Sequence, residues 1–221
     1  MVFVHLTIIR TPFSDDFEIS KNHSIQFSET LLLPPCLPTK TIALAINYQG
    51  ATGQTKDMLE PLVFLKSSNC VIGCNDNVKI AFTSETWGES ELGVVIKKET
   101  KNISSEKVCD HILGYVPVND VSCENVDGRD HHLARSKSAD GYCPVGHWID
   151  TEYNYREKMI EAFHNETLIR RGSTAEMIWN PEKIIVWLSS WMTLYPGDII
   201  PSGCPDALPF EIGDIIEIEI E

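Results

Sequence analysis

Apolar residues in this chain are grouped mostly in short runs of strand length. The clearest runs are TIALAIN (41–47), PLVFLKSS (61–68), ELGVVIKK (91–98) and YVPVNDVS (115–122). The C-terminal IIEIEIE alternates isoleucine with glutamate, and this period of two predicts a half-exposed strand. The pattern therefore predicts a core built mainly from β-strands.

Helical spacing of apolar residues is strongest over residues 181–192. Asn180 suits the cap position and Pro181 suits the first turn, where a missing N–H costs nothing. In this helix Trp191 and Met192 are predicted to be core residues. Because strands outnumber the few separate helices, the predicted fold class is α+β with a β-rich core.

A second, shorter helix is predicted from Glu106 to Leu113. Ser104 and Ser105 can cap its start, and Gly114 is placed to end it. The polar segment 123–140 that follows the next strand reads as a long loop, and long loops in compact domains tend to be functional or disordered.

The domain organisation follows from length and proline content. The chain has 221 residues, enough to bury one sizeable core. Residues 1–40 are predicted to form a small N-terminal segment of short strands and turns, because Pro34, Pro35 and Pro38 near its end cannot lie in a helix interior or a central strand. Residues 41–221 are predicted to form the main domain.

Charge and cysteine content narrow the class of protein. The net charge of −14 argues against nucleic acid or an anionic membrane as a partner. No stretch approaches the eighteen or so apolar residues of a membrane span, and the N-terminus lacks the features of a secretory signal. The seven cysteines are odd in number and include no Cys-x-x-Cys, which predicts reduced thiols in a cytoplasmic protein.

Three acidic residues form the first candidate site. Glu89 and Glu91 lie two apart in a predicted strand, so both project from one face, and Asp120 follows the next strand. Two carboxylates about 5 Å apart repel by about 3 kcal/mol at an effective dielectric near 20. A divalent cation would cancel this repulsion, and all-oxygen ligands suit Mg²⁺ or Mn²⁺ rather than zinc. The alternative is the wet face of a half-buried strand, which is the commoner origin of a Glu-x-Glu pair.

Three further residues, Lys66, His131 and His132, each allow a functional and a non-functional interpretation. Lys66 closes a predicted buried strand, so its ammonium either reaches water or meets an anion. His131 and His132 could bind a metal, although adjacent histidines in a polar loop are more often solvated and no second Cys/His pair at zinc spacing accompanies them.

Six segments in chain order resemble the fumarylacetoacetate hydrolase family, in particular its 2-hydroxyhepta-2,4-diene-1,7-dioate isomerase and 5-oxopent-3-ene-1,2,5-tricarboxylate decarboxylase branch. The resemblance covers roughly residues 41 to 219. The segments are VFLK (63–66), the Glu-x-Glu-Leu-x-Val-Val-Ile run (89–96), GYVPVNDVS (114–122), KSADGYCPVG (137–146), LSSWMTLYPGD (188–198) and SGCP (202–205).

The resemblance implies a β-rich roll of the family's C-terminal-domain type, with a few short helices, in which Glu89, Glu91 and Asp120 hold Mg²⁺ or Mn²⁺. A small anionic oxo-acid substrate would then chelate the ion through a carboxylate and an adjacent keto or enolate oxygen. The resemblance also implies a homodimer.

The resemblance assigns substrate contacts as well. It implies that Lys137 faces the same pocket as a catalytic and substrate-binding residue, and that Gly203 and Cys204 in the SGCP turn bind a substrate carboxylate. Lys66 could pair with a distal carboxylate, which would let an acidic protein accept a dianion.

The sequence departs from the family pattern at four positions. Where hydrolytic and decarboxylating members carry Asn-Tyr-x-x-His-x-x-Glu on a mobile loop, this chain has Ala51 and Gln54 at the histidine and glutamate positions. Neither can take a proton from water at neutral pH. Glu124 replaces the usual arginine after the Asn-Asp-Val-Ser run, and Cys204 replaces the threonine of the Gly-Thr-Pro turn.

The predicted function follows from these departures. Losing the acid–base pair harms isomerisation less than hydrolysis, which predicts metal-dependent isomerisation or tautomerisation of an unsaturated 2-oxo (2-hydroxy-diene) dicarboxylate in aromatic or amino-acid catabolism. One alternative is C–C cleavage of an acylpyruvate or decarboxylation of oxaloacetate, with His131 or His132 as the base. The other is a non-catalytic relic that binds a metal or an acid.

Overall fold

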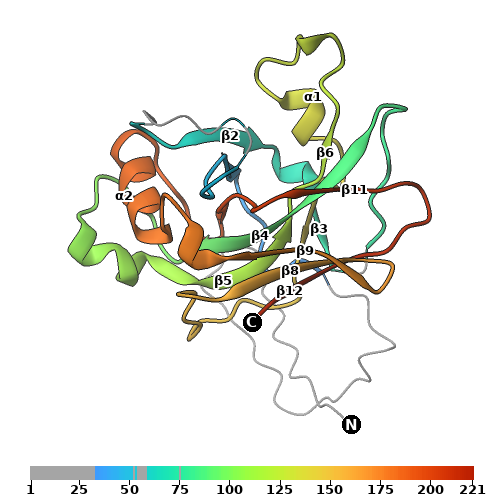
Figure 1. Cartoon of the computed structure of the whole chain (residues 1–221). Helices are drawn as coiled ribbons and strands as arrows, with labels where there is room; N and C mark the ends of the chain where they lie inside the picture. Colours follow the sequence, from blue (N-terminus) through green and yellow to red (C-terminus); the bar gives the residue numbers. More distant parts are fainter. Residues whose placement is uncertain (1–32, 52, 54–58, 75) are drawn as a thin grey trace, which may run out of the picture.

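The protein is described by a computed structural model for residues 33–51, 53, 59–74 and 76–221 (Figure 1). The predicted short strands and turns of residues 1–32, and most of the loop around Gln54, lie outside the described residues. Residues 33–40 run as extended chain and bends into the first strand. The boundary between the N-terminal segment and the main domain remains a prediction.

Nine strands of the described chain form one large sheet. Its main path has the order β2-β1-β10-β4-β5-β7-β3, and both β6 and β11 also pair with β4. The strands are β1 (Thr41–Ala45), β2 (Leu62–Lys66), β3 (Val71–Gly73), β4 (Thr86–Ile96), β5 (Ile112–Asn119), β6 (Ser122–Cys123), β7 (Cys143–Val145), β10 (Ile199–Pro201) and β11 (Ala207–Pro209). The prediction of a strand-rich core is confirmed.

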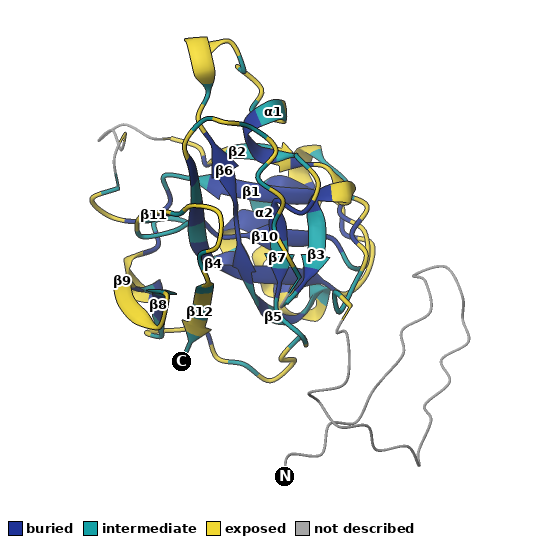
Figure 2. Cartoon of the chain, turned by 90° about the vertical axis from the view of Figure 1, so that its right-hand side faces the viewer, coloured by how far each residue is buried: buried dark blue, intermediate teal, exposed yellow. Residues whose placement is uncertain are grey.

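A second, three-stranded sheet in the described residues has the order β12-β8-β9. Its strands are β8 (Met159–His164), β9 (Thr167–Ser173) and β12 (Ile216–Ile220), all antiparallel. Strand β12 alternates half-buried isoleucine with exposed glutamate, as its sequence predicts. In Figure 2 strand β9 is largely exposed and β8 is buried or half-buried, whereas the strands of the large sheet are mostly buried.

Helices are few and short. They are α1 (Ala134–Lys137), α2 (Pro181–Trp191) and four 3₁₀ turns in the described chain: Ser68–Cys70, Ser105–His111, Val126–Gly128 and Thr174–Glu176. Helix α2 begins as predicted, because the Asn180 side chain accepts a hydrogen bond from the Lys183 N–H. Its buried face packs on the apolar side of β1 and β4.

Two predictions about helices are wrong. The segment after Ser104 is a 3₁₀ turn that ends at His111, and Gly114 belongs to β5. Glycine is needed there because a Cβ would lie 2.3 Å from the Asp150 carbonyl oxygen. Trp191 is not a core residue: it ends α2, is 49% exposed and packs edge-on against Trp187. Met192 does pack partly against the core, as predicted.

The remaining expectations from composition concern thiols and membranes. All seven cysteines lie in the described residues and none forms a disulfide. Among the described residues, no helix is long and apolar enough to cross a membrane.

Candidate metal centre

Strand β4 positions the first two acidic residues. Glu91 lies opposite Val118 of β5, and Glu89 lies near the start of the same strand, so both side chains project from one face of β4. Asp120 follows the last residue of β5, and its N–H donates a hydrogen bond to the Glu89 carbonyl at 2.9 Å. Pairing of β4 with β5 therefore brings together residues that are about thirty positions apart.

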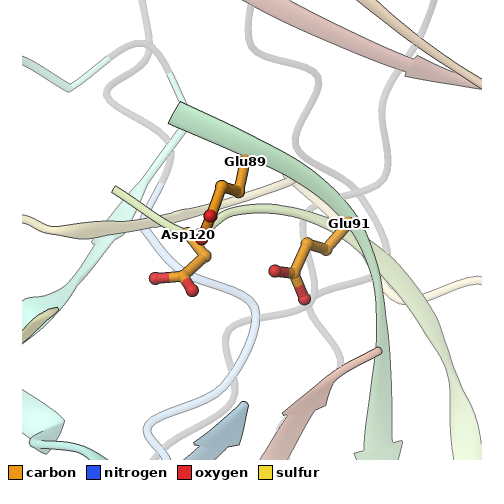
Figure 3. Close-up of side chains that lie close together, drawn as sticks. All are labelled: Glu89, Glu91 and Asp120. Carbon is orange, nitrogen blue, oxygen red and sulfur yellow. The ribbon is translucent and has the colours of Figure 1, made fainter. Parts of the chain in front are cut away.

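The three carboxylates form one cluster. Each of Glu89, Glu91 and Asp120 offers an oxygen, and these oxygens lie within 4.8 Å of one another. Figure 3 shows the two glutamates on one strand, with Asp120 beside them from the neighbouring segment. The expectation that these three side chains converge is confirmed, and the alternative of a solvated strand face is wrong because Glu91 and Asp120 are buried.

Burial and mutual repulsion dominate the electrostatics of the cluster. Burial, with Asp120 and Glu89 as charged neighbours, raises the pKa of Glu91 well above its usual range. Burial also raises the pKa of Glu89, although Lys137 opposes this. The pKa of Asp120 is lower than usual, because the charges of Lys137 and Lys66 outweigh its burial.

Two lysines hold the acidic cluster together. The Lys137 ammonium forms ion pairs with Glu89 and with Asp120 Oδ2, the latter at 2.7 Å. The Lys66 ammonium forms an ion pair with Asp120 Oδ1. Of the two alternatives for Lys66, meeting an anion is therefore the one observed. Burial lowers the pKa of Lys137, but Asp120 and Glu89 more than offset this and raise the pKa above its usual value.

The predicted substrate turn also reaches the cluster. The Gly203 N–H donates a 2.6 Å hydrogen bond to Glu91 Oε2, and the neighbouring Cys204 thiol has a pKa raised well above normal by burial and by Glu89 and Glu91. The Asn47 side chain fixes this turn by donating to the Ser202 carbonyl at 2.7 Å. The turn thus supports an acidic side chain, and its predicted contact with a substrate carboxylate remains a prediction.

Sequence reasoning missed several residues that orient Glu89. The Trp87 indole N–H and the Ser122 hydroxyl each lie 3.4 Å from one of its carboxylate oxygens, and the Glu89 N–H donates to Asn119 Oδ1 at 3.2 Å. Gly88 leaves room for Asn119, because a Cβ there would lie 2.6 Å from that amide oxygen. The period of two along β4 could have indicated Trp87, which lies on the same face as Glu89.

Two buried hydroxyls lie beside the acidic cluster. Tyr48 Oη and Ser202 Oγ are buried, and neither makes a hydrogen bond of ordinary geometry within the described part of the chain. Burial and the charges of Glu91 and Cys204 raise the pKa of Tyr48, although its contact with the Ser202 side chain opposes this. Buried polar groups are nearly always satisfied, so polar atoms of a ligand or water are expected nearby. With three oxygen donors, the site fits a hard divalent ion.

His131 and His132 are not part of the acidic cluster. Both are exposed, and they line a separate cavity of about 390 Å³ beside strand β2. Helix α1 starts shortly after them, so the predicted long loop is partly helical. Phe64, which also lines this cavity, lies under the Lys137 ammonium at 4.7 Å from the ring centre.

Comparison with known proteins identifies the family of this chain. Residues 40–221 match the family described as fumarylacetoacetate (FAA) hydrolase C-terminal. The chain belongs to the fumarylacetoacetate hydrolase family. The resemblance found in the sequence is thereby confirmed, as is the β-rich fold. Relatives in this family are isomerases and hydrolases that act on small organic acids, so this chain is an enzyme of that kind.

Three relatives of this fumarylacetoacetate hydrolase family member are informative. It is 29% identical to the oxaloacetate tautomerase fahd2 of Xenopus laevis, over 91% of this chain and 69% of the relative. It matches the structure of a 5-carboxymethyl-2-hydroxymuconate delta-isomerase from Mycobacterium smegmatis with a TM-score of 0.83 and 30% identity, over 91% and 82% of the two chains. It also matches maleylpyruvate hydrolase from Sphingobium sp. SYK-6 in complex with manganese(II) and pyruvate, with a TM-score of 0.76 and 30% identity over 90% and 73%.

Proposed function

We propose that this protein is a divalent-metal-dependent enzyme that isomerises or tautomerises a 2-oxo acid, specifically an unsaturated 2-oxo (2-hydroxy-diene) dicarboxylate of aromatic or amino-acid catabolism. The observation that carries the proposal is the buried cluster of Glu89, Glu91 and Asp120 with the Lys137 ammonium at its edge. The names of the tautomerase and the isomerase among its relatives support the reaction class.

The three carboxylates would hold Mg²⁺ or Mn²⁺. The manganese and pyruvate bound to the related hydrolase support this choice of ion and of ligand. When bound, the ion would act as a Lewis acid toward the oxygen of a 2-oxo acid. Glu91 is fixed for this role by the Gly203 N–H, and Glu89 by contacts from Trp87 and Ser122.

Lys137 would supply the positive charge for the reaction. It is almost fully buried, and Asp120 and Glu89 keep it protonated by raising its pKa. A buried ammonium stabilises negative charge that develops on a nearby oxygen, because the local dielectric is low. Lys137 would therefore stabilise the enolate form of the substrate, which is the species common to isomerisation and tautomerisation.

Ala51 supports proton relocation over hydrolysis. It stands where the family resemblance implies a histidine in hydrolytic members, and its N–H donates to the Tyr48 carbonyl at 3.1 Å in a turn that follows β1. An alanine side chain cannot activate water. Moving a double bond needs no activated water, since one proton leaves one carbon and returns at another.

The test follows ultraviolet absorbance of a 2-hydroxy-diene acid and of enol-oxaloacetate. We expect an absorbance change that requires Mg²⁺ or Mn²⁺ and disappears when a chelator is added. The Lys137→Met variant should lose this absorbance change although it still binds metal. Proton NMR in D₂O should show deuterium entering the carbon next to the keto group. No metal-dependent change with the pure protein would exclude the proposal.

The related maleylpyruvate hydrolase favours a second candidate, C–C cleavage of an acylpyruvate or decarboxylation of oxaloacetate. Hydrolytic C–C cleavage needs a base to activate water, and the exposed His131 and His132, which line the cavity beside β2, are the candidates. Pyruvate release can be measured with lactate dehydrogenase. If pyruvate release persists when both His131 and His132 are replaced by Ala, these histidines are not the base. If the wild type releases no pyruvate, this second candidate function is excluded.

Two further expectations can be tested with the same preparations. The homodimer implied by the family resemblance predicts about twice the 24.9 kDa chain mass in light scattering. The predicted cytoplasmic location can be checked by fractionation of cells that express the protein.

A further inference from the structure

Lys66 faces the metal centre from inside the protein. It is the last residue of β2 and is 0% exposed. Its ammonium forms an ion pair with Asp120 Oδ1 and donates to the Val121 carbonyl at 3.1 Å. Two of its three donors are thus used by adjacent residues of one segment. Nothing in this arrangement presents the ammonium to a substrate.

The two lysines hold Asp120 in different ways. Lys137 contacts Asp120 Oδ2 and is shared with Glu89, so it lies among the oxygens that an ion would use. Lys66 contacts the other oxygen, and among the three acidic residues its ion pairs in the described structure involve Asp120 alone. An ion that joins the three carboxylates would compete with Lys137, whereas the Lys66 contact can persist.

Asp120 would depend on the Lys66 contact once an ion took the place of Lys137 at Oδ2, because the backbone alone does not orient its side chain. It lies just past the end of β5, and its backbone is fixed by the hydrogen bond to the Glu89 carbonyl. A carboxylate with one oxygen held cannot rotate freely, so its second oxygen keeps its direction. Partners of this kind, one shell beyond a metal, orient its ligands and contribute to affinity.

We propose that Lys66 is a positioning residue: it holds Asp120 Oδ1 so that the carboxylate presents its other oxygen toward Glu89 and Glu91 for a divalent ion. Lys66 acts through Asp120 and does not contact the substrate. This replaces the expectation from the sequence that Lys66 pairs with a distal carboxylate. The proposal rests on the metal site proposed above, and it is independent of which reaction follows.

The direct test compares Mn²⁺ affinity by calorimetry in the wild type, Lys66→Met and Lys40→Met. We expect the Mn²⁺ Kd of Lys66→Met to rise about 10- to 100-fold, the usual effect of removing a partner of a metal ligand. Lys40 is the matched control, since it pairs with the equally buried Asp198, which is not part of the acidic cluster. The Lys40→Met variant should bind Mn²⁺ with a Kd within about twofold of the wild-type value. An unchanged Kd in Lys66→Met overturns the proposal.

A second measurement separates positioning from substrate contact. At saturating Mn²⁺, Lys66→Met should bind oxalate with the Kd of the wild type, because only the metal step is impaired. Weaker oxalate binding at saturating Mn²⁺ overturns the proposal. These are binding measurements, so they remain decisive if the wild type binds Mn²⁺ yet shows no turnover, the result that would exclude the proposed function alone.

If Lys66→Met does not fold, the wild type provides the test. A crystal structure with Mn²⁺ and oxalate should show the Lys66 ammonium on Asp120 and apart from oxalate. An ammonium bound to oxalate overturns the proposal.

Discussion

The backbone N–H of Gly203 donates a 2.6 Å hydrogen bond to the Glu91 carboxylate. Glu91 lies on β4, and Gly203 lies in the turn just after β10. These two strands pair antiparallel. Gly203 has a φ of +86°, and a Cβ there would lie 2.9 Å from the Asn47 Cβ. Glycine at this position therefore keeps an acidic side chain of the metal centre in place.

Replacing Gly203 with Ala should weaken both the fold and the metal site. The backbone conformation alone costs a residue other than glycine about 1–3 kcal/mol. Urea denaturation should show this loss, and Mn²⁺ affinity should fall because the turn shifts away from Glu91. Gly197→Ala is the control: its φ is similar, +83°, but its Cβ would meet only ordinary contacts. Equal Mn²⁺ affinity in the two variants would contradict the prediction.

Replacing Glu91 with Gln should separate apo stability from metal stabilisation. The amide removes one of three clustered carboxylates, two of them buried, so we expect a higher melting temperature than the wild type in the presence of a chelator. The wild type should gain about 2.7 kcal/mol of stability at a Mn²⁺ concentration of about 100 Kd. The variant should gain almost nothing. Thermal denaturation with and without Mn²⁺ measures both effects, and an equal gain in the variant would rule out Glu91 as a ligand.

Cys36 should react with alkylating agents only at high pH. Burial and the negative charge of Asp198 raise the pKa of this thiol to about 12. Only the thiolate reacts, so at pH 7 the thiolate fraction of Cys36 should be roughly three-thousandfold smaller than that of a free thiol with a pKa near 8.5. Its rate with iodoacetamide should rise tenfold per pH unit up to about 12. Peptide mass spectrometry can compare it with the exposed Cys109. Equal labelling of the two at pH 7 would be inconsistent with this pKa.

Replacing Asp198 with Ala should strongly destabilise the protein. This buried carboxylate accepts hydrogen bonds from the Thr39 hydroxyl at 2.7 Å and the Tyr195 N–H at 2.8 Å, and it pairs with Lys40. Its removal leaves these donors unpaired, which should cost about 3 kcal/mol or more in urea denaturation. Arg129→Ala, which breaks an exposed pair with Asp127, should cost less than about 0.5 kcal/mol. Similar losses in both variants would contradict the argument.

The strands could be predicted because their signal is local. The apolar runs of β1, β2, β4 and β5 and the alternation of β12 appear in the sequence itself. The prediction of a helix from Glu106 to Leu113 that ends at Gly114 is wrong. Gly114 lies in a strand because Asp150, a residue on a distant segment, packs closely against it. The prediction that Trp191 is a core residue is wrong for a similar reason. Spacing shows which face of a helix is apolar but not where the helix leaves the core.

The sequence by itself determined that Glu89 and Glu91 share one face of a strand, because side-chain direction alternates along any strand. It determined too, through family resemblance, that Asp120 and Lys137 belong to the same site. Only the tertiary structure decided what Lys66 contacts, because its ammonium meets Asp120 through the placement of β2 and β5 in one fold. Pairings between distant segments depend on how the whole chain packs, and no local pattern encodes them.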